Sequence, residues 1–303
     1  MTTMDLYDTA PPAPAGGRAA ALKGRMQAAA SAVLLPALRR VAGDLIGGES
    51  LDEAWAVAQR LEAQGLAHTL GFWDTPDYGP DQVVAIYRDS IARAAQSDLD
   101  AYVSIKPPAL HYDRGVARDL AAAAAAAGVR LHCDSHALAV QDLTLAFADD
   151  LAARLGPGRV SVSLPGRWAR SVMDAARLLD HGIGVRVVKG QWPDPTDPAR
   201  DVRDGFLDLA ASLAGRTGPI ALASHDAALL AAAAEPLVAA GTAFELEFIH
   251  GLQTPALLAL AESCGVRARL YVPFGRGFVP SALGVLKRNP RLALSALKAM
   301  LAR

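Results

Sequence analysis

The sequence predicts an α/β fold of the (β/α)8 TIM-like barrel type, with helices before the barrel and a displaced helix at its C-terminal end. From about residue 65 onward, a short apolar segment, a turn that is polar or contains glycine, and an Ala- and Leu-rich segment recur eight times. Strands that alternate with helices pair in parallel through right-handed crossovers, and eight such units close into a barrel. The length of 303 residues, 52% of them hydrophobic, suits one such barrel.

The expected strands are short segments whose β-branched and apolar residues favour an extended, buried backbone. In chain order they are residues 68–73, 101–106, 129–134, 159–164, 184–189, 219–224, 243–249 and 266–273. The segments between them are amphipathic helices, for example residues 202–213 and 255–264. A doubly wound open sheet is the alternative, which is less favoured because no GxGxxG turn follows an early strand.

Helices are also expected outside the repeating pattern. Two precede it, near residues 19–47 and 51–64, and Ser50 and Glu53 fit a capping box at the start of the second. Two more are expected within residues 280–303, after the eighth strand. They complete the elements that the local pattern predicts.

The domain organisation follows from these elements. Residues 1–20 are rich in Pro, Ala, Gly and Thr and lack the basic start and apolar run of a signal peptide, so they are expected to form a disordered tail. N-terminal helices over 21–64 then lead into a barrel catalytic domain over 65–303. No linker divides residues 20–303 into two domains.

Composition excludes several classes of function. A formal net charge of −1 with no basic tract argues against nucleic acid as a main partner. The two cysteines, Cys133 and Cys264, are too few for a disulfide framework, lack zinc-site spacing and indicate a reducing, cytoplasmic location. No apolar segment reaches the length of a transmembrane helix.

Residues 185–192, Val-Arg-Val-Val-Lys-Gly-Gln-Trp, indicate where a site lies. Arg186 stands in the middle of a predicted buried strand and Lys189 stands at its end. An unpaired charge in such a place costs several kcal/mol, so both cations need anionic partners. Two interpretations stay open at this point: two structural salt bridges, or a site for a negative or electron-rich ligand.

The active site of a (β/α)8 barrel lies at the carboxyl ends of its strands. Polar side chains are expected to gather there from all eight strands. They are Asp74, Lys106, Asp134, Ser163, Arg186, Lys189, Ser224, His225, Asp226, Glu245, Glu247, His250, Arg269 and Tyr271. This rim holds at least three cations, enough to bind an anionic cofactor or a carboxylate.

A metal site is a competing interpretation for the third strand. His132, Asp134 and His136 alternate along it, so their side chains share a face and could bind a divalent metal. The more favoured interpretation places His132 among hydrogen bonds inside the barrel and His136 in the following turn.

Six segments, in order and in matching strands, resemble motifs of the proline dehydrogenases, flavoenzymes built on a distorted (β/α)8 barrel. The segments are residues 103–106, 131–134, 185–190, 223–226, 244–251 and 269–275. The third is nearly the family's V-R-L-V-K-G, the fourth resembles A-T-H-N, and the last resembles R-x-Y-V-P-Y-G. The resemblance covers roughly residues 65–290.

The resemblance implies FAD at the carboxyl end of the barrel, with hydride transfer from a carbon bonded to nitrogen. It implies that Arg186 faces flavin N5 and stabilises the reduced ring. Lys189, Gly190, Ser224 and His225 would hold the pyrophosphate, ribose and ring, and Trp192 would stack on cofactor or substrate. The implied cofactor set also includes Ser163 and Glu247. Lys106, Asp134 and Tyr271 would surround the substrate and, with Arg186, form the catalytic set.

Departures from the family bear on the substrate. The two arginines that bind the proline carboxylate in the family fall on Gly284 and Val285, and the following glutamate falls on Arg288. These three positions are the remaining substrate-site candidates. On strand 4, Ser163 replaces a glutamine that contacts the flavin. Lys106, Arg276 or Arg288 are candidates to replace the lost cations.

The sequence therefore predicts an FAD-dependent oxidoreductase of specialised metabolism, acting on an amine, amino acid or N–N compound other than L-proline. The alternatives are a true L-proline dehydrogenase, a metal-dependent barrel hydrolase, and a barrel that binds a ligand without catalysis. The electron acceptor stays open among quinone, O2 and others. A small-molecule substrate and no nucleic acid are expected, and a homo-oligomer is compatible with the Ala-rich surfaces.

Overall fold

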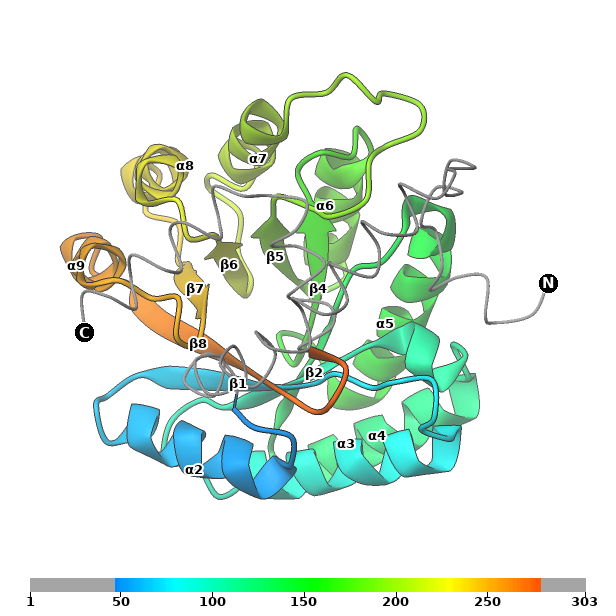
Figure 1. Cartoon of the computed structure of the whole chain (residues 1–303). Helices are drawn as coiled ribbons and strands as arrows, with labels where there is room; N and C mark the ends of the chain where they lie inside the picture. Colours follow the sequence, from blue (N-terminus) through cyan, green and yellow to red (C-terminus); the bar gives the residue numbers. More distant parts are fainter. Residues whose placement is uncertain (1–46, 279–303) are drawn as a thin grey trace, which may run out of the picture. The chain divides into compact units, whose positions relative to one another are not determined.

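A computed structural model of the chain describes residues 47–278. Eight parallel strands form a closed barrel in chain order, and β1 closes it by pairing with β8 (Figure 1). The strands are β1 (Ala67–Phe72), β2 (Tyr102–Ile105), β3 (Arg130–Cys133), β4 (Val160–Pro165), β5 (Gly184–Val188), β6 (Ile220–Ala223), β7 (Glu245–Ile249) and β8 (Arg267–Phe274). The predicted barrel is confirmed and the open sheet is wrong.

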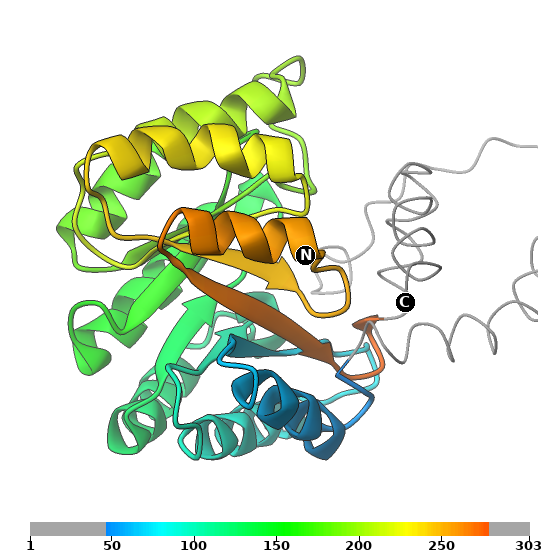
Figure 2. The same ribbon diagram turned by 90° about the vertical axis from the view of Figure 1, so that its left-hand side faces the viewer.

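The helices lie outside the strands, as two views at right angles show (Figures 1 and 2). They are α2 (Leu51–Glu62), α3 (Pro80–Ala94), α4 (Arg114–Ala127), α5 (Gln141–Leu155), α6 (Ser171–Asp180), α7 (Val202–Ala211), α8 (Ala227–Ala239) and α9 (Pro255–Ser263), with short 3-10 turns η2 (Pro107–Leu110) and η3 (Leu138–Val140). The predicted boundaries of the strands and of the example helices agree with these to within two residues.

Local capping signals hold in the structure. Ser50 caps α2 in the predicted capping box, in which its hydroxyl accepts from Glu53 N while Glu53 Oε2 accepts from Ser50 N at 3.0 Å. The expected disordered tail and the helices near 19–47 and 280–303 lie outside the described residues. Within residues 47–278, no helix has both the length and the apolarity needed to cross a bilayer.

The two faces of the strands differ in chemistry, and this difference positions the site. Apolar side chains such as Leu70, Val162 and Leu246 belong to the buried core cluster of strands and helices. The alternate positions face the barrel interior and include buried polar residues: Thr69, Tyr102, His132, Ser163, Arg186, Glu247 and Arg269. Barrel interiors are usually filled by branched apolar residues. A polar interior of this kind requires a connected set of hydrogen bonds.

Candidate active site

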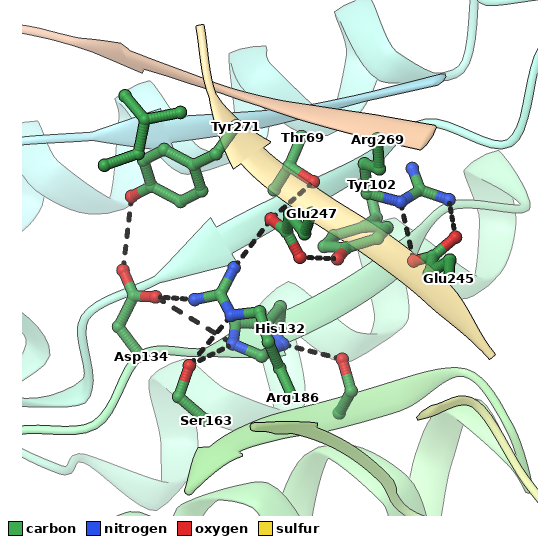
Figure 3. A network of polar contacts seen from close by, with 12 residues as sticks. Thr69, Tyr102, His132, Asp134, Ser163, Arg186, Glu245, Glu247, Arg269 and Tyr271 are labelled. Carbon is green, nitrogen blue, oxygen red and sulfur yellow. Dashed lines mark hydrogen bonds and ion pairs between the residues drawn. The ribbon is translucent and has the colours of Figure 1, made fainter. Parts of the chain in front are cut away.

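Arg186 lies at the centre of the interior network (Figure 3). Its Nη1 donates to Glu247 Oε1 at 2.8 Å, its Nη2 donates to Asp134 Oδ1, and its Nε donates to Ser163 Oγ at 2.9 Å. Only 6% of Arg186 is exposed. Burial alone would lower its pKa, but the two carboxylates outweigh burial and raise the pKa of Arg186 above its usual value. The guanidinium is therefore charged and fixed.

The guanidinium still has donors to spare. A guanidinium carries five N–H groups in a planar fork, and the bonds to described residues use three of them. One N–H on each of Nη1 and Nη2 remains. The salt-bridge interpretation of Arg186 is therefore correct, and it leaves room for a ligand contact as well.

His132 completes the layer beneath Arg186. Its Nδ1 lies 2.7 Å from Ser161 Oγ and its Nε2 lies 2.9 Å from Ser163 Oγ. Burial, followed by the Arg186 charge, lowers the pKa of His132 well below its usual value, so the ring is neutral. The network is satisfied when Ser163 accepts from Arg186 and donates to Nε2, which places the His132 proton on Nδ1.

Asp134 connects the guanidinium to β8. Its Oδ2 accepts from Tyr271 Oη at 3.3 Å, and Trp73 Nε1 donates to the same Tyr271 Oη at 3.2 Å. Burial opposes ionisation of Asp134, but Arg186 and Lys106 outweigh burial and lower its pKa to about 2. Asp134 is thus a carboxylate between a cation and a neutral phenol, next to the open end of the barrel.

Lys106 is the second buried cation of the site. Its Nζ donates to Phe72 O and lies 4.4 Å from the centroid of the Trp73 ring. Burial lowers the pKa of Lys106, and Asp134 partly opposes this effect. Trp73, whose ring also packs edge-to-face on Phe278, was not among the predicted site residues. Its position directly before Asp74, at the end of the first strand, could have predicted that Trp73 lies in the site.

The loops after β5 and β6 present a second polar group. Lys189 Nζ lies 3.7 Å and Arg203 Nη1 lies 2.7 Å from Asp226 Oδ2, so two cations share one carboxylate. Ser224 Oγ accepts from Asp226 N at 3.2 Å and keeps its own proton for donation. His225 Nε2 accepts from Ile249 N at 2.9 Å, which places its proton on Nδ1.

Gly190 and Trp192 shape the loop between these groups. Gly190 has φ +90°, and a Cβ there would lie 2.5 Å from Pro165 Cβ, so only glycine lets the chain turn closely against β4 after Lys189. The Trp192 ring lies 5.9 Å, centroid to centroid, from the His136 ring. Buried His136 Nδ1 and Gln253 Oε1 have no hydrogen-bond partner among the residues described. Both lie in loops at the carboxyl ends of the strands.

Two residues expected at the carboxyl rim lie elsewhere. Glu245 begins β7 and Arg269 lies near the start of β8, and they pair at the amino end of the barrel, where Arg269 Nε lies 2.7 Å from Glu245 Oε1 (Figure 3). A cavity of about 340 Å³ opens at that end, lined in part by Tyr102 and Ser161. The prediction was wrong because strand tilt and stagger, which the sequence does not display, set the depth of each residue.

The metal interpretation is not favoured by the geometry. Both ring nitrogens of His132 face serine hydroxyls, and His132 Nε2 lies 3.9 Å from Asp134 Oδ1. His136 packs beside Trp192 instead. Across residues 47–278, no group of three His, Cys, Asp or Glu side chains is arranged to hold a metal ion.

Among the substrate-site candidates after β8, the structure describes only Arg276. Gly284, Val285 and Arg288 lie outside the described residues. Arg276 donates from Nη2 to Asp77 and stacks on Tyr78, 4.9 Å from the ring centroid, at a half-exposed surface position. Arg276 therefore has a carboxylate partner of its own on the loop after β1.

Known proteins resemble this chain in sequence and in fold. No family model matches the chain. The proline dehydrogenase of Deinococcus radiodurans is 27% identical over 279 residues, which cover 84% of this chain and 88% of that protein. The chain is therefore similar to a proline dehydrogenase over most of its length.

Solved structures share the fold of this chain. Proline utilization A from Bdellovibrio bacteriovorus, inactivated by N-propargylglycine, matches with a TM-score of 0.69 and 19% identity over 80% of this chain. A proline utilization A from Bradyrhizobium japonicum matches with a TM-score of 0.63 and 17% identity over 78% of this chain. The chain spans about a third of those structures, 32% and 29% of their lengths.

Proposed function

We propose that the protein is an FAD-dependent oxidoreductase that oxidises a carbon bonded to nitrogen. The observation that carries this proposal is the Arg186 guanidinium, held inside the barrel between Asp134 and Glu247 with N–H groups left for a ligand. The Deinococcus radiodurans relative, named a proline dehydrogenase, supports the same chemistry. When bound, the isoalloxazine ring would supply the hydride acceptor.

The residues of the site fit FAD by their chemistry. Lys189 and Arg203 share one carboxylate and so leave an excess positive charge for a pyrophosphate. Ser224 and His225 each keep a proton to donate, and Trp192 offers a flat ring beside the loop. Arg186 would stabilise negative charge on the reduced ring. Ser163 and Glu247 are 2% exposed and act through the guanidinium that they hold.

The test of this proposal is direct. The purified protein is expected to be yellow, with a bound isoalloxazine that absorbs near 450 nm (about the usual flavin band), and to lose that band when a substrate reduces it. A colourless protein that fails to bind added FAD would contradict the proposal. A yellow protein that no amine reduces would favour ligand binding without catalysis.

L-proline is expected to be a poor substrate. The family's arginine pair is Gly284–Val285 here, and a hydrogen bond to a charged group contributes about 1.5–3 kcal/mol, so the loss removes about 3–6 kcal/mol of carboxylate binding. This is about two to four decades of affinity. Arg276 is bound to Asp77 and Lys106 donates to Phe72 O, so each of these cations already has a partner among the described residues.

The measurement is anaerobic bleaching of the flavin by L-proline, compared with proline analogues without a carboxylate. A double variant, Gly284→Arg with Val285→Arg, is expected to gain reduction by L-proline, while the parent prefers the uncharged analogues. Rapid bleaching of the parent by L-proline would show that the arginine pair is dispensable and that the protein is a true L-proline dehydrogenase. The predicted cytoplasmic location remains a separate proposal.

A further inference from the structure

Glu247 is a buried carboxylate beside Arg186. It is 2% exposed and lies inside the barrel on β7, next to Arg186 (Figure 3). Its Oε1 accepts from Arg186 Nη1 at 2.8 Å and from Thr69 Oγ1 at 3.4 Å, and its Oε2 accepts from Tyr102 Oη at 3.0 Å. The guanidinium can only donate, and it forms a charge-assisted ion pair with the carboxyl group.

Glu247 changes the charge of the site. Asp134 already pairs with Arg186, so Glu247 is a second carboxylate on one guanidinium. Lys106 is the further buried cation near Asp134, and His132 is neutral because burial and Arg186 lower its pKa. The buried cluster of two cations and two carboxylates therefore has no net charge. Without Glu247 it would have a net positive charge.

Net charge beside a flavin matters because the reduced ring is anionic. A charge held in a buried site acts over several ångströms with little screening. On the basis of the proposed function, we infer that Glu247 has two roles. It fixes the Arg186 guanidinium, and it lowers the reduction potential of the bound flavin because its negative charge cancels part of the positive field of that guanidinium. Glu247 is thus a positioning and tuning residue that does not itself touch the substrate.

The test is Glu247→Gln in the FAD-bound protein. Glutamine has nearly the same shape, its amide oxygen can accept from Arg186, and the Tyr102 hydroxyl can turn to accept from the amide nitrogen. Removal of the charge is expected to raise the two-electron potential of the flavin by about 30 mV or more. This corresponds to about a tenfold change in the equilibrium constant for flavin reduction. Sulfite, which forms an anionic adduct with oxidised flavins, is expected to bind about tenfold more tightly.

Glu245→Gln is the matched control. Glu245 lies two residues earlier on the same strand, about 6.6 Å further toward the amino end, and its partner is Arg269. The same loss of charge there is expected to change sulfite binding less than about threefold, because the charge lies further from the site. Melting temperatures with and without FAD verify that both variants fold.

The outcomes separate the inference from the proposed function. A protein that binds no FAD overturns both. A flavin-bound, folded Glu247→Gln protein whose potential and sulfite affinity equal those of the parent overturns the inference alone. If Glu247→Gln does not fold, Asp134→Asn removes the other carboxylate of the same guanidinium and is expected to raise the potential in the same direction. An unchanged potential in that variant also overturns the inference.

Discussion

Replacement of Arg186 by methionine is expected to lower the free energy of unfolding of the flavin-free protein by about 3–5 kcal/mol. Asp134 and Glu247 would be left as buried carboxylates without the cation that satisfies them. Such a loss is a large part of the stability of a typical domain. Urea unfolding followed by circular dichroism measures it, and absorbance measures the accompanying weaker binding of FAD.

Arg269→Met is the control for this prediction. Arg269 is fully buried and also pairs with carboxylates, Glu245 and Asp100, but at the amino end of the barrel. It should lose comparable stability and keep the flavin spectrum of the parent. If Arg186→Met does not fold, Arg186→Lys is the substitute, because it keeps the charge and loses only the planar fork. It should lower the free energy of unfolding by less than Arg186→Met. Equal flavin properties in the Arg186 and Arg269 variants would place the cofactor away from residue 186.

Acid is expected to destabilise the protein between pH 6.5 and pH 4. Burial lowers the pKa of His68, His136 and His225 to about 4, with a further contribution from Lys189 at His225. The unfolded chain binds protons at these histidines below about 6.5, whereas the folded protein does not until about 4. Their contribution to stability is therefore complete above pH 6.5 and is lost as the pH falls to 4.

The size of the acid effect follows from the shift. A shift from 6.5 to about 4 at fully buried His68 corresponds to about 3 kcal/mol, and partly exposed His136 and His225 contribute less. Asp134, with a pKa of about 2, adds its own loss only below about pH 4. Urea unfolding of the apoprotein across this range measures the slope, and a free energy that stays level from pH 7 to pH 5 would contradict the prediction.

His68→Leu isolates one of these groups. Both ring nitrogens of His68 are buried under α2, beside Trp55, without a hydrogen-bond partner among the described residues. A buried polar group without a hydrogen-bond partner typically costs about 1–3 kcal/mol of stability, and leucine removes that group. The variant is expected to be more stable than the parent at pH 5. The pH dependence of its free energy of unfolding should correspond to about one fewer proton bound on unfolding. An unchanged slope would show that His68 does not carry the shift.

Local sequence patterns determined much of this protein. Apolar segments separated by amphipathic helices predict the eight strands and their order, and Ser50 and Glu53 predict the start of α2. Both signals act over a few residues, so they can be recognised along the chain. The polar strand ends also predicted that Lys106, Asp134, Arg186 and Tyr271 lie close together, and the hydrogen bonds of the structure join Asp134 to two of them.

Only the tertiary structure decided how deep each polar residue lies and with which partner. Glu245 and Glu247 are two residues apart on one face of one strand, yet one pairs with Arg269 at the amino end and the other with Arg186 near the site. Thr69 and Tyr102 were missed as partners for the same reason. Depth in a closed barrel depends on the tilt and stagger of all strands together, and no local sequence pattern contains that information.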